Sequence, residues 1–135
     1  MSKYLDMARR LRQDPEVHYS CSQATLMPFA EDAGLDVETA RKLASNFNAG
    51  MRRGSVCGAI TGGLMVLGLF GVNDTAAVHD YHKKFSDRHE GRLDCAELLR
   101  ASAQRGEIKK EHCDGMVYEA VMLVEEMLKE RELIW

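Results

Sequence analysis

The sequence has little proline and no segment of low complexity. Only 2 of its 135 residues are proline, and no stretch rich in Gly, Ser or Pro divides the chain. A chain of this length can bury a single core. We therefore expect residues 1–135 to form one domain.

An excess of positive charge and long apolar runs are also missing. The formal net charge is −3, which provides neither a basic footprint for nucleic acid nor a polybasic membrane anchor. The longest apolar stretch, residues 59–71, is too short to span a bilayer. Residues 1–13 lack the apolar centre of a signal peptide. These absences predict a cytoplasmic protein with no nucleic-acid or membrane partner.

Familiar catalytic motifs are absent as well. The four cysteines are widely spaced and include no C-x-x-C, which excludes a thioredoxin motif, a ribbon-type zinc site and a ferredoxin-type run. There is no Ser-His-Asp context, and the glycine-containing stretch 50–58 lacks the Lys-Ser/Thr of a phosphate-binding loop. His79 and His82 share a helix face, but we interpret them as surface residues.

What the sequence does have is helical periodicity along nearly all of its length, with no convincing strand. The pattern predicts an all-α bundle of five to seven helices. A proline inside the second helix, Pro28, predicts a kink or a late restart there. The expected helices cover residues 4–11, 21–33, 37–47, 57–69, a segment after Asp74, 95–103 and 113–132.

The segment from Cys57 to Leu69 is apolar on nearly all sides, which predicts the central, buried helix. Each glycine in a helix costs about 1 kcal/mol relative to alanine. A helix that keeps several of them should have another backbone, or a bound group, close to it. The glycines concerned are Gly58, Gly62, Gly63 and Gly68.

Each of the four cysteines is predicted to lie where a helix begins. Ser20 and Gln23 form the pattern of a capping box around Cys21, and Asp94 and Glu97 repeat it around Cys95. The unpaired N–H groups and partial positive charge of a helix start favour a thiolate, which is the nucleophile and the metal ligand. The other two predicted helix-start cysteines are Cys57 and Cys113.

Cys57 is the strongest candidate for a reactive thiol. It combines a helix start with a glycine-containing approach and two nearby cations, Arg52 and Arg53, and these features lower a thiol pKa. The expected cofactor contacts around it are Arg52, Arg53, Gly54 and Gly58.

Alternation of helix direction predicts which cysteines can meet. One helix lies between the first two cysteine helices and another between the second and third, so Cys21, Cys57 and Cys95 should return to the same end of the bundle. No intervening helix is evident before Cys113, so its place beside Cys95 is the least supported. His112, next to Cys113, can act as an alternative ligand or support one.

The run Gly54–Gly68, with its C-G-A-x-x-G core at Cys57–Gly62, resembles the signature of the small prokaryotic C_GCAxxG_C_C family, which is regarded as redox-active. The upstream context Ser20–Ala24 and the two later cysteines match the family pattern from about Ser20 onward. The resemblance implies four shared cysteines with a redox or metal role, and it supplies no substrate. The loop departs from the pattern at Asn48-Ala49, where the family often has more glycines.

Three hypotheses follow for the four cysteines, Cys21, Cys57, Cys95 and Cys113. In the first, they form one thiolate site in a redox protein, either as ligands of an iron–sulfur cluster or other thiophilic metal, or by thiol–disulfide exchange with an unknown redox partner. In the second, they hold a structural zinc ion in a non-enzymatic module. In the third, they are ordinary buried thiols of a helical interaction protein. The wide apolar faces also allow a homodimer.

Overall fold

The computed structural model describes residues 2–134, which form seven α-helices joined by short turns. The expected all-α bundle of five to seven helices is confirmed. The helices are α1 (Lys3–Arg12), α2 (Cys21–Ala30), α3 (Val37–Leu43), α4 (Gly58–Leu69), α5 (Thr75–Arg88), α6 (Cys95–Gln104) and α7 (Lys109–Glu130). Two short turns, η1 (Glu31–Ala33) and η2 (Gly50–Gly54), lie between them.

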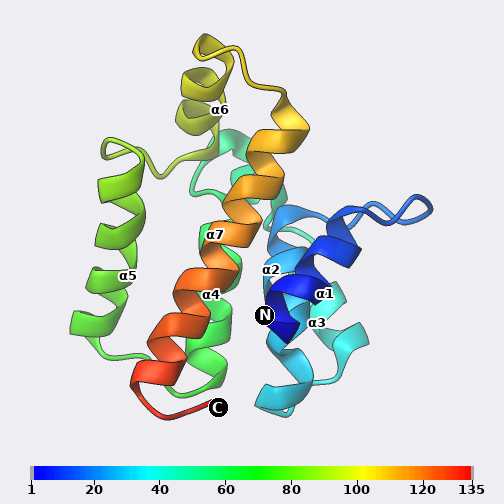
Figure 1. Cartoon of the computed structure of the whole chain (residues 1–135), viewed down its shortest axis with the longest axis vertical. Helices are drawn as coiled ribbons and strands as arrows, with labels where there is room; N and C mark the ends of the chain where they lie inside the picture. Colours follow the sequence, from blue (N-terminus) through cyan, green and yellow to red (C-terminus); the bar gives the residue numbers. More distant parts are fainter. Residues whose placement is uncertain (1, 135) are drawn as a thin grey trace.

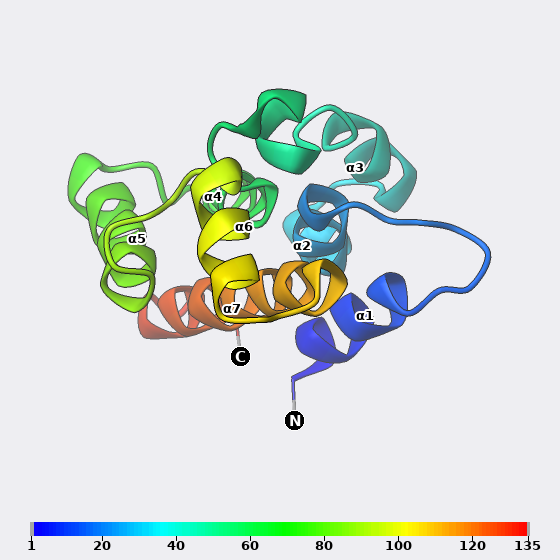
Figure 2. The same cartoon turned by 90° about the horizontal axis from the view of Figure 1, so that it is seen from above.

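Helix α7 runs along the length of the molecule, and α4 and α2 pack against it and against each other (Figure 1). Helix α5 lies on one side of this centre, and α1 and α3 lie on the other. Helix α6 lies at one end of the bundle, and Figure 2 shows it between α5 and α2. No helix within residues 2–134 is both long and apolar enough to cross a bilayer.

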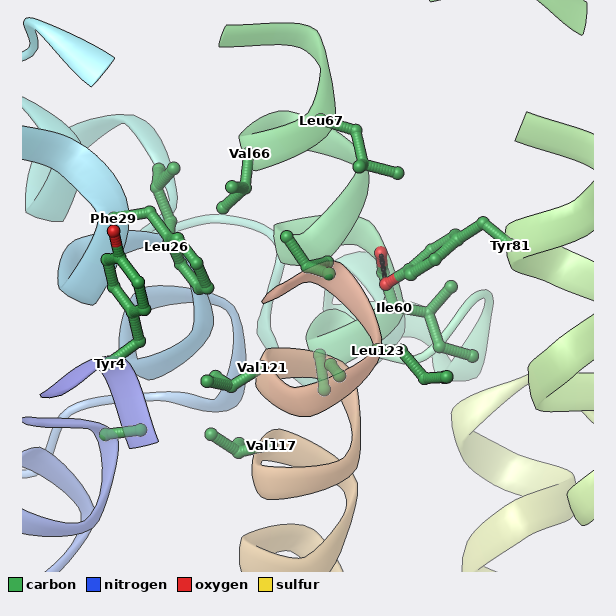
Figure 3. Close-up of a cluster of buried hydrophobic side chains, with 14 of the residues drawn as sticks. Tyr4, Leu26, Phe29, Ile60, Val66, Leu67, Tyr81, Val117, Val121 and Leu123 are labelled. Atoms are coloured by element: carbon green, nitrogen blue, oxygen red, sulfur yellow. Dashed lines mark hydrogen bonds between the residues drawn. The ribbon is translucent and has the colours of Figure 1, made fainter. Parts of the chain in front are cut away.

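The core is built from the faces that the periodicity predicts. Both apolar stripes of the last helix are buried, and their side chains meet α4 and α2 in one cluster (Figure 3). Tyr4 stacks on Phe29 with ring centroids 4.3 Å apart, which attaches α1 to α2. The buried stripe residues of α7 are Met116, Val117, Ala120, Val121, Leu123, Val124, Met127 and Leu128.

The glycines of α4 do allow close approach at two faces. A Cβ at Gly62 would lie 2.9 Å from the backbone oxygen of Ser22 on α2. On the other face, the same atom at Gly63 would collide with Tyr81 of α5, whose hydroxyl donates to the Ile60 carbonyl at 2.9 Å. The expectation is wrong for the fourth glycine, Gly68, which is exposed and has no such neighbour within 4 Å.

Two helix ends differ from the sequence prediction. Helix α3 ends at Leu43 instead of residue 47. Side chains of α2 replace the hydrogen bonds that a further turn of α3 would make. The Ser22 hydroxyl donates to the Ala44 carbonyl at 2.8 Å, and the Gln23 side-chain amide donates to the Arg41 carbonyl at 3.0 Å. Helix α7 begins at Lys109, one turn before Cys113.

Helix α2 continues through Pro28 as far as Ala30. The chain then tightens into η1, which is capped by Gly34, where a φ of 82° places the backbone in the left-handed region that terminates helices. The expected helix over residues 21–33 is therefore divided into an α-helix and a short tighter turn.

Candidate functional site

The side chains of all four cysteines line one cavity of about 410 Å³ at the end of the bundle where α6 lies. All four are free thiols; Cys57 is buried and the other three are half-buried. The remaining lining residues come from α1, α4, α6 and α7 and from the segments before α2 and η2. The cavity thus joins parts of the chain that are distant in sequence.

The start of α2 positions Cys21 through the predicted capping box. The Gln23 N–H donates to the Ser20 hydroxyl at 3.3 Å, and the Gln23 side-chain oxygen accepts from the Ser20 N–H at 2.9 Å. This reciprocal pair satisfies two of the N–H groups that a helix start leaves free. Cys21 is therefore fixed as the first residue of a well-formed helix.

A short antiparallel bridge positions Cys57 and Cys95. The bridge pairs Val56 with Asp94, and its two hydrogen bonds use the backbone N–H groups of the cysteines themselves. The Cys57 N–H donates to the Leu93 carbonyl at 2.9 Å, and the Cys95 N–H donates to the Ser55 carbonyl at 2.7 Å. The entries to α4 and α6 are thereby held side by side.

This bridge also corrects the second capping box. Asp94 stands at the N-cap of α6, but its side chain accepts no capping hydrogen bond. The partner of the Cys95 N–H is the distant Ser55 carbonyl, which the local pattern Asp94–Glu97 could not reveal.

Cys113 lines the cavity from inside a helix and not from the predicted helix start. It is the fifth residue of α7 and does not begin that helix. Because α6 is short and α7 folds back against it, α7 passes the cavity about one turn after its own start. The missing intervening helix is thus unnecessary.

Gly58 is the lining residue that allows Cys21 to lie so near the start of α4. A Cβ at Gly58 would collide with the Cys21 sulfur, and it would also lie 2.8 Å from the Phe47 carbonyl. A side chain at this position would therefore displace either the thiol or the backbone before η2. Gly58 acts on the site through space and provides no chemical group.

Burial and mutual repulsion disfavour thiolates at three of the four positions. Burial raises the pKa of Cys57 to about 12, and the charge of Cys21 adds to the effect. Burial is also the largest cause of the raised pKa of Cys95, and the charge of Cys113 is the second. For Cys113, burial again comes first, and the charge of Cys21 is the second cause that raises the pKa. The charge of Cys21 thus acts on all three of the other thiols.

The prediction that Cys57 has a lowered pKa is wrong. Its sulfur does receive the backbone N–H groups of Ala59 and Ile60, which lower the pKa as a helix start should, but the cost of burying a charge is larger. Cys57 is only 7% exposed. The sequence indicated that Cys57 lies at a helix start, but it could not indicate how deeply the thiol is buried.

The loop before Cys57 contributes less to the cavity than predicted. Gly58 lines it, whereas Arg52, Arg53 and Gly54 are not among its lining residues. Both arginines are exposed, and the Arg52 guanidinium donates to Asn48 and to the Ser45 carbonyl, each at 3.2 Å. Gly54 lies against Ala96 at the start of α6, and a Cβ added at Gly54 would lie 3.1 Å from the Ala96 Cβ.

This loop makes an unusual left-handed turn. Ala49, Met51 and Arg52 have φ values of 51°, 58° and 58°, and Gly50 between them has 63°. Residues other than glycine rarely adopt this region, and each costs about 1–2 kcal/mol there. The turn directs Asn48 and Ala49 toward the cavity.

Several lining residues were not found from the sequence. Arg12 is the most informative, because its side chain is 5% exposed and its guanidinium forms an ion pair with Asp114 at 2.7 Å that joins α1 to α7. Its position on the inner stripe of the first helix, one turn after Ala8, was the available signal. The other unpredicted lining residues are His18, Asn48, Ala49, Leu98, Leu99, Lys109, Lys110 and Met116.

His112 lies between the cysteine cavity and a second, more open cleft that contains Glu107 and Glu119. Burial lowers its pKa, and the Glu107 carboxylate, 4.0 Å from its Nδ1, opposes the change. The imidazole is therefore neutral near pH 7. It is adjacent to Cys113, as the sequence indicates.

The donor set does not form a ready metal site. Within residues 2–134, no three His, Cys, Asp or Glu side chains are placed so that they could hold one metal ion. A closed Cys₄ zinc site needs all four sulfurs about 2.3 Å from the ion. The side-chain positions do not provide that geometry, so no step of the chemistry below is assigned to a metal.

The comparisons with known proteins give one match. The model of the family described as "Putative redox-active protein (C_GCAxxG_C_C)" matches residues 19–127, which include all four cysteines. Comparisons with curated proteins and with solved structures found no match.

Proposed function

Because the chain belongs to the C_GCAxxG_C_C family, we propose that it is a redox protein whose cysteines perform thiol–disulfide exchange inside the cavity. The observation that carries this proposal is the position of four free thiols around one cavity of about 410 Å³. Ordinary buried thiols would be packed against side chains, whereas these face room for a substrate.

Cys21 is the attacking thiol in this proposal. It is half-buried at the first residue of α2, faces the space above Gly58, and lies within electrostatic reach of the other three thiols. Its thiolate attacks one sulfur of a substrate disulfide. The substrate S–S bond breaks, one half leaves as a thiolate that takes a proton from water, and a mixed disulfide with Cys21 remains.

Cys57 resolves this intermediate. Once Cys21 carries the mixed disulfide it has no charge, so one of the causes that raise the pKa of Cys57 is gone. Cys57 then attacks the Cys21 sulfur and closes a Cys21–Cys57 disulfide, and the second half of the substrate leaves as a thiol with the proton that Cys57 loses. Two electrons pass from the protein to the substrate, and a reduced dithiol partner returns them.

Cys95 and Cys113 form the second pair. This pairing is supported by two observations: both thiols line the cavity, and the charge of Cys113 is the largest electrostatic contribution to the raised pKa of Cys95. The two thiols can reduce the Cys21–Cys57 disulfide by the same exchange and pass the oxidation to a second site on the wall of the cavity.

Trapping with a neutral disulfide, bis(2-hydroxyethyl) disulfide, tests this order of events. In Cys57→Ser, the mixed disulfide at Cys21 should accumulate and be seen by mass spectrometry of the intact protein. Cys21→Ser should abolish the adduct, and Cys95→Ser, the matched control, should still form the Cys21–Cys57 disulfide. An adduct that forms equally well in Cys21→Ser would overturn the assignment of the attacking thiol.

A further inference from the structure

Positive groups gather around the cysteine cavity, although the whole chain has a net charge of −3. Three cations, Arg12, Lys109 and Lys110, are among its lining residues. No Asp or Glu side chain is among its lining residues. The lining of the cavity is therefore positively charged, whereas the whole chain has a negative net charge.

The ion pairs of the described residues offset only part of this charge. One carboxylate, Asp114, serves both Arg12 at 2.7 Å and Lys110 at 2.9 Å. The Arg12 guanidinium also donates to the Tyr19 carbonyl at 2.8 Å, and the Lys110 ammonium donates to the Arg12 carbonyl at 3.2 Å. Lys109 is exposed and pairs with none of residues 2–134. Three cations and one carboxylate leave a net charge of +2 at the cavity, and Lys109 is the cation without an acidic partner among the described residues.

The placement of the lysines goes against the helix that carries them. Lys109 and Lys110 are the first two residues of α7, and the N-cap, Ile108, has no side chain that can accept from the first-turn N–H groups. A helix start is already positive, and a cation there is unfavourable by typically about 0.3–1 kcal/mol. Lysines and free N–H groups together make this edge of the cavity attractive to an anion.

Building on the proposed exchange reaction, we infer that its preferred oxidant is a small disulfide that carries carboxylates. The carboxylates lie among Lys109, Lys110 and the start of α7, while the disulfide sulfur reaches Cys21. The exchange then proceeds as described above, with the substrate S–S bond replaced by a Cys21–Cys57 bond. The two halves leave as thiols that bear the carboxylates.

Three alkyl disulfides that differ in charge test this inference: 3,3′-dithiodipropionate, which is dianionic, bis(2-hydroxyethyl) disulfide, which is neutral, and cystamine, which is dicationic. Their rates of oxidising the reduced protein are each divided by their rates with a small free thiol. At about 0.01 M salt, where screening extends over about 30 Å, the normalised rate should be about tenfold or more higher for the dianion than for the neutral disulfide, because clefts of one charge speed association.

Charge reversal supplies the control. Lys109→Glu should lower the anion preference about tenfold and raise the rate with cystamine, whereas Lys42→Glu, an exposed lysine on α3 outside the cavity, should leave the preference unchanged. Equal normalised rates for the three disulfides, with Cys21 still oxidised, would overturn the inference and leave the exchange reaction standing. Failure of every disulfide to oxidise the protein would overturn the exchange reaction itself.

Discussion

At the scale of single residues, the depth of a thiol outweighs its place in a helix. Cys57 has the backbone N–H contacts that a helix start provides, yet burial raises its pKa to about 12. The general rule that helix starts favour thiolates applies to exposed positions. In the proposed exchange, Cys57 is the thiol that keeps its proton until Cys21 has reacted.

The buried Cys57 should make stability fall in alkaline solution. The ordinary pKa of this thiol is near 9 and the folded value is about 12, so between these values the folded state binds more protons than the unfolded chain. The stabilisation is complete below about pH 9 and is lost as pH rises toward about 12.

Urea unfolding at about pH 8 and about pH 10 measures this effect. Cys57 should account for about 1 kcal/mol of the difference between the two values, and Cys57→Ala should show a difference smaller by that amount. A variant that loses as much stability as its parent would mean that the Cys57 thiol ionises normally in the folded protein.

Met51 provides a second test at this scale. It is exposed and has a φ of 58°, where a Cβ costs about 1–2 kcal/mol. Met51→Gly should therefore be more stable than Met51→Ala by about 1 kcal/mol, since alanine retains the strain and glycine does not. If alanine proves equal or better in thermal unfolding, the left-handed turn before Cys57 is absent in solution.

At the scale of helices, caps with a local partner could be predicted, and ends fixed by distant groups could not. The side chains of Ser20, Asp36 and Asp74 each accept a hydrogen bond from the backbone N–H three residues ahead, which is a local pattern. The start of α6 depends instead on Ser55. Helix α3 ends where side chains of α2 meet it, and no local pattern in residues 37–47 contains that information.

The glycines of α4 offer a matched pair of substitutions. A side chain at Gly62 would press against the Ser22 carbonyl and Thr25, at 2.9 Å and 3.0 Å for the Cβ alone, whereas Gly68 in the same helix faces open space. Gly62→Leu should destabilise the protein by about 1–3 kcal/mol through overpacking. Gly68→Ala should stabilise it by about 1 kcal/mol through helix propensity.

Thermal unfolding of both variants decides whether α2 packs closely on α4. A raised midpoint for Gly62→Leu, with unchanged thiol reactivity, would contradict the position of α4 against α2. The Gly68→Ala variant shows what the same helix gains when no neighbour opposes the new side chain.

At the scale of the whole molecule, the sequence predicted the fold class and the meeting of Cys21, Cys57 and Cys95, because both follow from alternating helices. It could not predict which charged groups surround the thiols. Arg12 and Asp114 are far apart in sequence, and their ion pair exists only because α1 packs on α7. The four cysteines could be identified one by one, but the character of their cavity is a property of the packed bundle.

The central claim, that the four cysteines act as two redox pairs, can be tested by native mass spectrometry of the protein purified without oxygen. Before oxidation, the mass should be that of the reduced chain without metal. After equilibration with bis(2-hydroxyethyl) disulfide, the mass should be lower by two hydrogen atoms for each disulfide formed. A reduced dithiol should restore the original mass. A retained zinc ion, a retained iron–sulfur cluster, or a mass that does not change on oxidation would contradict the account.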